Sequence, residues 1–169
     1  KRTTPSFFAK HTLTELRGWS DYALEGQVRL THPMRYDAAS DRYLSSLYPP
    51  ESNHLVDVEG LIADAFEFYL LSDGAACVGC IGVNLKDEHP EIKRLFVKEE
   101  FRGRGHGRQL LDFIIARCRE LGHDRIRLET GVNQPEALGL FRNMGFREIP
   151  PFGSYGPDPL SVFFERSCQ

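Results

Sequence analysis

A seven-residue segment constrains this chain more than any other part of its sequence. Between a predicted strand and the most regular predicted helix, glycine alternates with basic side chains in Arg102-Gly103-Arg104-Gly105-His106-Gly107-Arg108. Glycines at alternate positions let the backbone approach a ligand closely and adopt positive φ. Successive N–H groups that open a helix bind phosphate, and the helix dipole reinforces this. The segment predicts a site for an anionic, phosphate-bearing cofactor; a solvated turn without a ligand is the alternative.

Two well-known phosphate-binding motifs do not fit this segment. The dinucleotide fingerprint G-x-G-x-x-G fails, because its last position falls on Arg108 when counted from Gly103 and on Leu110 when counted from Gly105. A P-loop requires a Gly-Lys pair, and the sequence contains none. The expected cofactor is therefore bound in another way.

The hydrophobic pattern predicts one α/β domain with a mixed sheet. The chain has 169 residues, which suits a single domain. Asp73-Gly74 predicts a tight hairpin turn, and a run of apolar residues at helical spacing ends at Gly122. The predicted strands are 28–31, 66–71, 75–85, 92–97, 126–129, 146–149 and 160–165, and the predicted helices are 37–47, 55–65, 107–121 and 135–144. We expect residues 1–24 to be an N-terminal extension and residues 25–169 to be the domain.

Composition excludes several classes of protein. The formal charge of −3 argues against non-specific binding of nucleic acid, which needs a basic excess. The longest stretch without a charged residue is the 12 residues from Gly74 to Leu85, whereas a membrane span needs about 20. Four cysteines are too few for a disulfide scaffold. The sequence therefore favours a reducing, cytoplasmic setting.

Some residue spacings resemble functional motifs but are explained by ordinary structural roles. Cys77-Val78-Gly79-Cys80 has the spacing of a redox or metal motif, but no second Cys/His pair lies near it, so we expect buried strand cysteines. The six histidines show no metal-ligand spacing, and no metal is predicted. A basic stripe, solvated or facing the cofactor, is expected from Arg117, Arg119, Arg125 and Arg127.

The block 91–146 resembles the GNAT superfamily of N-acetyltransferases. The family's signature places Arg or Gln, two residues, Gly, one residue and then Gly or Ala, and Arg102, Gly105 and Gly107 match it. The strand 93–97 and the segment 140–146 are similar to the family's cofactor strand and to its Leu-Tyr-x-x-x-Gly-Phe helix. The resemblance implies a single-domain α/β (α+β) fold, with a mixed, mostly antiparallel twisted sheet of six to seven strands and flanking helices.

The same resemblance implies acetyl-CoA as cosubstrate. The pyrophosphate would bind the loop formed by Arg102, Gly103, Arg104, Gly105, His106, Gly107 and Arg108, and the pantetheine would pair with the backbone of Leu95, Phe96 and Val97 like an added strand. Gln134 stands where the family usually has an Asn that contacts the cofactor. Phe141 occupies the helix position where many members place a Tyr that acts as an acid, and it is expected to contact the cofactor.

Two residues are candidates for proton transfer. Glu91 precedes Arg102 by 11 residues, the spacing of the catalytic glutamate in histone-acetylating GNAT members, and is the expected general base. Tyr155 lies in a glycine-flanked loop that can bring a phenol toward the cleft, and is the expected acid. Glu91 as a solvated strand-end carboxylate and Tyr155 as an ordinary loop residue remain open alternatives. A reaction without a side-chain acid is also open, because a thiolate is a fair leaving group.

The acceptor site is expected in the connection between the first two predicted helices. In the family this connection often walls the acceptor, so Glu51, Asn53 and His54 could orient an amine; a plain loop explains them as well. The expected function is direct N-acetyl transfer to a primary amine of a small molecule or amino acid, with no nucleic acid or membrane partner; a homodimer stays open. The alternatives are a protein lysine or N-terminal acetyltransferase and a non-catalytic acyl-CoA-binding module.

Overall fold

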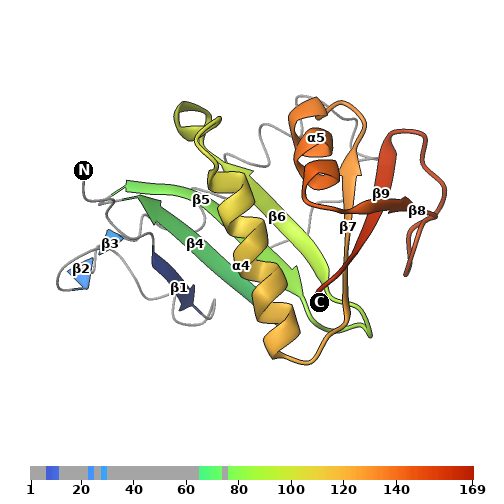
Figure 1. Cartoon of the computed structure of the whole chain (residues 1–169), viewed down its shortest axis with the longest axis horizontal. Coiled ribbons are helices and arrows are strands. Elements are labelled where there is room, and N and C mark those ends of the chain that lie inside the picture. Colours follow the sequence, from blue (N-terminus) through green and yellow to red (C-terminus); the bar gives the residue numbers. More distant parts are fainter. Residues whose placement is uncertain (1–6, 12–22, 25–27, 30–64, 74–75) are drawn as a thin grey trace.

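A single seven-stranded sheet organises the part of the chain that the computed structural model describes, residues 7–11, 23–24, 28–29, 65–73 and 76–169 (Figure 1). Its spatial order is β1-β4-β5-β6-β7-β9-β8. The strands are β1 (Phe7–His11), β4 (Phe66–Asp73), β5 (Ala76–Asn84), β6 (Glu91–Val97), β7 (Arg125–Gly131), β8 (Arg147–Ile149) and β9 (Ser161–Ser167). Two short strands, β2 (Ala23–Leu24) and β3 (Val28–Arg29), pair with each other in a separate sheet.

The sheet is mixed and mostly antiparallel, as predicted. Only the pair β6–β7 is parallel among the strand pairs of the described sheet; the five others are antiparallel. The hairpin β4–β5 and the strands β6 to β9 fall where the hydrophobic pattern places them, with ends that differ by one or two residues. Strand β1, which pairs with β4, lies in a region where the hydrophobic pattern shows no clear period. The predicted helices 37–47 and 55–65 fall outside the described residues, except for residue 65, which is in a turn.

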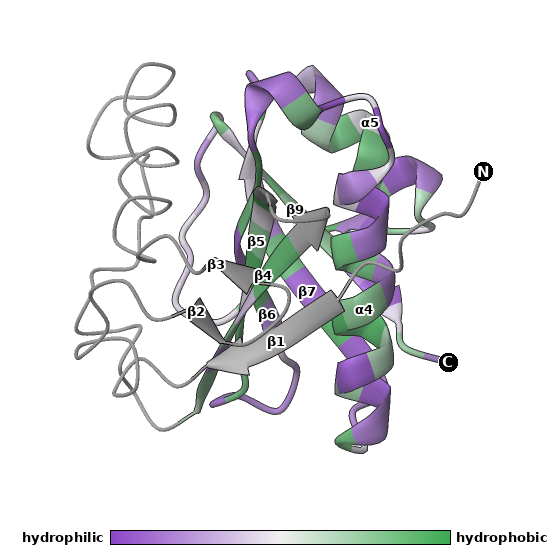
Figure 2. Ribbon diagram, turned by 90° about the vertical axis from the view of Figure 1, so that its left-hand side faces the viewer, coloured by the Kyte–Doolittle hydropathy of each residue, from purple (hydrophilic) through white to green (hydrophobic). Residues whose placement is uncertain are grey.

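Two helices, α4 (His106–Glu120) and α5 (Pro135–Asn143), lie on the same side of the sheet (Figure 2). The side chains of Leu110, Leu111 and Ile114 on α4 are fully buried and pack against the strand residues Ile126 and Leu128. Because these apolar residues recur at three- and four-residue steps, they predicted α4 to within one residue at each end. Neither helix has the length and apolar character that a bilayer crossing requires, within the described part of the chain.

An ion pair attaches α4 to β4. Arg117 donates from Nε and Nη2 to the two carboxylate oxygens of Glu67, each at 3.0 Å, and the hydroxyl of Tyr69 donates to the same carboxylate. The predicted basic stripe is therefore wrong: Arg117 is bound on the helix side of the sheet, whereas Arg125 and Arg127 bind Glu165 on β9. The helix ends before β7 begins, so one periodicity does not continue through all four arginines.

Candidate active site

The glycine loop presents free main-chain N–H groups at the start of α4. A short 3₁₀ helix (Glu99–Phe101) precedes the loop, and the N–H of Arg102 donates to the carbonyl of Glu99 at 3.1 Å. Gly103 and Gly105 have φ of 73° and 86°, and Gly105 is the N-cap of α4. Within the described residues, the N–H groups of residues 103–105 donate to no backbone carbonyl. These donors, together with the helix dipole, fit a diphosphate group.

Space for the predicted ligand is present on the same loop. A Cβ built at Gly103 or Gly105 would meet no heavy atom within 4 Å. Arg104 lies over the ring of Phe101, and the exposed side chain of Arg108 is 3.7 Å from Asp112, one helical turn further on. The loop therefore combines positive charge with an accessible backbone, which is what a phosphate ligand requires.

Strands β6 and β7 separate soon after they begin. Their parallel register contains only Glu91 opposite Arg127 and Ile92 opposite Leu128, although both strands continue beyond these pairs (Figure 1). The remaining length of β6, including Leu95, Phe96 and Val97, has no ladder partner on the β7 side. A gap in the ladder leaves main-chain groups for an extended ligand to pair with. The phosphate-binding loop follows β6 directly, so loop and gap can hold two parts of one long molecule.

A β-bulge interrupts β6 beside this gap. Lys93 and Phe96 are three positions apart on β6, whereas their partners on β5, Gly82 and Cys80, are two positions apart. Arg94 has φ of 59°, the only positive φ at a non-glycine residue in the described part of the chain. Bulges bend a strand and leave one residue outside the ladder, and they occur frequently near active sites.

Glu91, Lys93 and Tyr155 form a hydrogen-bonded group at the closed end of the gap. The hydroxyl of Tyr155 donates to Oε1 of Glu91 at 2.6 Å, and Nζ of Lys93 is 2.8 Å from the same oxygen. Lys93 also donates to the Tyr155 hydroxyl. The other carboxylate oxygen of Glu91, Oε2, has no hydrogen-bond partner among the described residues. Glu91 is 8% exposed, so it is not a solvated strand-end carboxylate.

The environment of Tyr155 keeps its phenol protonated. Burial raises the pKa of Tyr155 most, and the negative charge of Glu91 and the hydrogen bond to that carboxylate raise it further. The ring packs against Phe152 and Phe163, with centroids 5.3 Å away in both cases. Tyr155 is therefore a fixed hydrogen-bond donor to Glu91 and not a loosely placed loop residue.

Of the three residues in this hydrogen-bonded group, the sequence predicted Glu91 and Tyr155 as candidates but not Lys93. A signal was present, because residues i and i+2 of a strand point to the same face and Lys93 follows Glu91 by two positions. The contact with Tyr155 joins residues 62 positions apart, and no local pattern encodes it.

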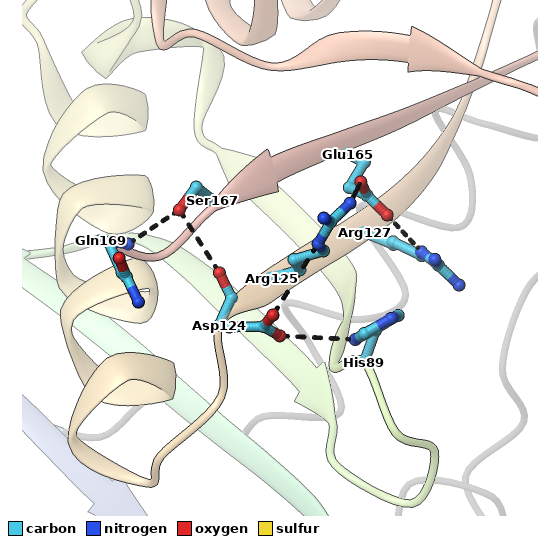
Figure 3. A network of polar contacts seen from close by, with 7 residues as sticks. All are labelled: His89, Asp124, Arg125, Arg127, Glu165, Ser167 and Gln169. Atoms are coloured by element: carbon cyan, nitrogen blue, oxygen red, sulfur yellow. Dashed lines mark hydrogen bonds and ion pairs between the residues drawn. The ribbon is translucent and has the colours of Figure 1, made fainter.

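A second polar group includes Arg125, Arg127 and Glu165 (Figure 3). Arg127 is opposite Glu91 in one ladder and opposite Glu165 in the next, so this group lies on the same face of the sheet as Glu91. Glu165 accepts from Nη1 of Arg125 at 2.6 Å and from Nε of Arg127 at 2.8 Å. Burial opposes ionisation of Glu165, but the hydrogen bonds from Arg127 and Arg125 outweigh it and lower the pKa of this carboxyl. A cavity of about 450 Å³ adjoins the group, and its walls include Arg125, Arg127, Phe152 and Glu165.

Three further residues that were predicted to contact the cofactor lie in different surroundings. His106 is buried at the start of α4 beside Phe101, with ring centroids 6.3 Å apart. Gly107 is packed closely, because a Cβ there would lie 2.9 Å from Cδ2 of Leu140 on α5. Gln134 is the N-cap residue of α5, just after β7.

Phe141 lies in the core, where its ring contacts those of Phe146 and Phe164 at centroid distances of 5.7 and 5.9 Å. Of the Cys77/Cys80 pair, Cys80 is buried as expected, and the side chain of Cys77 falls outside the described part. The acceptor candidates Glu51, Asn53 and His54 also lie outside the described residues.

Comparison with known proteins agrees with this geometry. The profile of the Acetyltransferase (GNAT) family matches residues 32–146. The chain belongs to the GNAT family of acetyltransferases. A relative from Azospirillum brasilense named IAA acetyltransferase is 43% identical over 128 residues, which are 75% of this chain and 84% of the relative. This GNAT chain is therefore an acyltransferase, and the family expected from its loop and helix motifs is confirmed.

Solved structures share the fold. A Klebsiella pneumoniae protein described as a candidate acyl-CoA N-acyltransferase is 25% identical and superposes with a TM-score of 0.72, covering 97% of this chain and 98% of that one. A Bacillus subtilis acetyltransferase solved in complex with CoA is 22% identical, with a TM-score of 0.57 over 76% of this chain and 91% of that one. The predicted GNAT-like fold class is confirmed.

Proposed function

We propose that this GNAT enzyme transfers the acetyl group of acetyl-CoA directly to the primary amine of a small molecule or an amino acid. The observation that carries the proposal is the position of Glu91. Its buried carboxylate lies where β6 and β7 part, with one oxygen held by Tyr155 and Lys93 and the other available to an incoming amine.

The chain's own residues fit the cosubstrate. Acetyl-CoA, when bound, supplies an acetyl group activated as a thioester. The N–H groups of residues 103–105 would hold its diphosphate, and the unpaired length of β6 would pair with its pantetheine arm. The glycines with positive φ and the open space beside them support this assignment.

Glu91 is proposed as the general base. A lysine-like amine has a pKa near 10.4, so freeing its nucleophilic form at pH 7 costs roughly 4.6 kcal/mol. Oε2 of Glu91 can accept the ammonium proton while Tyr155 and Lys93 hold Oε1 in place. Tyr155 remains the proposed acid, since its raised pKa keeps the proton that it would share with Glu91 or the leaving group.

Direct transfer is supported by the surroundings of the thiols. The three cysteines whose side chains the structure describes, Cys80, Cys118 and Cys168, are all buried. Burial raises the pKa of the Cys118 thiol to about 12, so this group is not a thiolate at neutral pH. None of the three is suited to carry an acetyl group between cosubstrate and acceptor.

A turnover assay tests the proposal. The purified chain is incubated with acetyl-CoA and, separately, with small amines, amino acids and peptides, while free thiol is followed colorimetrically and the acetylated product by mass spectrometry. We expect thiol release in step with acetylation of a small amine or amino acid. Release with peptides alone would instead make the chain a protein acetyltransferase. Tight CoA binding without release for any acceptor would make it a non-catalytic binding module.

A further inference from the structure

We infer that Arg127 binds a carboxylate of the acceptor, so that the substrate is an amino acid or a related amine that carries a carboxylate. This inference rests on the proposed function and narrows its substrate class. It is drawn from the cavity beside β7 and β9, which is separate from the phosphate-binding loop.

The guanidinium of Arg127 has N–H groups that no acceptor contacts among the described residues. Its Nε donates to Glu165, and its Cζ lies over the ring of Phe152, 5.5 Å from the centroid. Among the described residues, no acceptor contacts its two terminal nitrogens. The side chain is 27% exposed and lines the cavity. A fixed, half-buried guanidinium with unused N–H groups is suited to a planar, bidentate acceptor such as a carboxylate.

The positive charge of the cavity walls that is available to an anion lies on Arg127. Arg125 faces two carboxylates, since its Nη1 donates to Glu165 and its Nε lies 3.8 Å from Oδ2 of Asp124. Arg127 has Glu165 alone as its ion-pair partner among the described residues. A carboxylate in the cavity would be a second partner for Arg127.

Arg127 is also close enough to the proposed base to share one small ligand with it. It stands opposite Glu91 in the parallel register, and neighbouring strands lie about 4.8 Å apart. Phe152 contacts Tyr155, so the cavity adjoins the Glu91 group on the same face of the sheet. A molecule with its amine at Glu91 and its carboxylate at Arg127 needs only the short spacing that amino acids have.

The experiment compares matched acceptors. Each common L-amino acid is assayed beside its carboxamide, which keeps the amine and side chain but lacks the negative charge. The amine of the amide is less basic, so intrinsic reactivity favours the amide and cannot produce a preference for the acid. We expect kcat/KM to be higher for the acid. For Arg127→Gln the acid should lose about 10- to 100-fold in kcat/KM, the size expected for charge-assisted hydrogen bonds, and the amide should be almost unchanged.

Three further measurements make the result specific. Arg127→Lys, which keeps the charge without the planar fork, should fall between the wild type and Arg127→Gln. Arg142→Gln removes an exposed arginine that pairs with Glu148 and does not line the cavity, and it should leave turnover of both substrates unaffected. CoA affinity, measured by calorimetry, should be equal in all variants.

The outcomes distinguish a failure of the role of Arg127 from a failure of the proposed N-acetyl transfer. Equal or better turnover of amides or of amines without a carboxylate would overturn the role of Arg127 while leaving N-acetyl transfer intact. An equal loss for acid and amide in Arg127→Gln would also overturn it. Absence of thiol release with every amine would instead remove the proposed function itself.

Discussion

At the scale of single residues, the site depends on how one carboxylate is surrounded. Glu91 is buried, yet one of its oxygens receives both the Tyr155 hydroxyl and the Lys93 ammonium. These contacts fix the orientation of the carboxylate, because two donors on one oxygen leave it little rotational freedom. The second oxygen, Oε2, keeps its lone pairs for an incoming proton.

Glu91→Gln tests this arrangement. The amide oxygen of Gln can still accept from Tyr155 and Lys93, but the side chain no longer takes a proton. We expect kcat to fall by about 10²- to 10⁴-fold at neutral pH, with partial recovery as the pH approaches the pKa of the amine, since the free amine then forms without a base. A pH–rate profile measures this. Glu148→Gln, an exposed control, should follow the wild type; an unchanged profile for Glu91→Gln would remove Glu91 from the mechanism.

The sequence indicates candidate site residues where the information is local. Glu91 became a candidate through its distance from Arg102 along the chain, and the loop through its own composition. Lys93 and Arg127 were not singled out for the acceptor site, because their contacts involve partners that the fold brings together: Tyr155 for the first, and Glu165 and Phe152 for the second. Lysine and arginine are common on exposed faces. The sequence alone therefore does not distinguish a solvated side chain from one that specific partners hold in place.

At the scale of elements, two glycines with positive φ flank α4. Gly105 precedes it with φ of 86° and Gly122 follows it with φ of 88°, and a Cβ at either position would meet no neighbour. A β-branched residue at either place strains the backbone by about 1–3 kcal/mol. Only the first glycine lies in the phosphate-binding loop, so the two ends provide a matched pair.

A comparison of Gly105→Val with Gly122→Val should therefore distinguish the effect of backbone strain from the loss of CoA binding. Both variants should remain folded and lose similar stability in denaturant unfolding. Calorimetric titration should show that Gly105→Val loses at least about tenfold in CoA affinity, because the strained turn no longer directs its N–H groups at the phosphates, while Gly122→Val keeps the wild-type value. Equal affinities would contradict the placement of the diphosphate.

Elements with a strong period were predicted well, and those without one were not. The apolar steps of α4 and the Asp73-Gly74 dipeptide between the two strands of the β4–β5 hairpin carry their own signals in the sequence. Strand β1 does not, since it is specified by pairing with β4, which is far away in sequence. The hydrophobic pattern did not predict the bulge at Arg94, because no local sequence signal indicates positive φ at a non-glycine residue.

At the scale of the whole molecule, buried phenols link stability to alkaline pH. Burial raises the pKa of Tyr69 and of Tyr155, and the neighbouring carboxylates Glu67 and Glu91 raise them further. In the unfolded chain both phenols titrate near pH 10. Above that pH the unfolded state releases protons that the folded state retains, so the stability these groups provide is present below pH 10 and falls as the pH rises.

Unfolding in denaturant between pH 8 and 11 measures this effect. The free energy of unfolding should decline above about pH 10, and Tyr155→Phe should reduce the slope by up to about 1.4 kcal/mol per pH unit. Within the same series, Tyr69→Phe should act in the same direction. Identical slopes for the wild type and both variants would show that neither phenol has a raised pKa in the folded protein.

The separation of β6 from β7 has a consequence for handling the protein. Strands that part in mid-sheet create two edges inside the molecule, each with main-chain donors and acceptors that another extended chain can bind. A foreign peptide or a neighbouring copy can compete for those edges whenever nucleotide is scarce. Purification and storage with CoA should thus suppress aggregation, and light scattering during heating would show it.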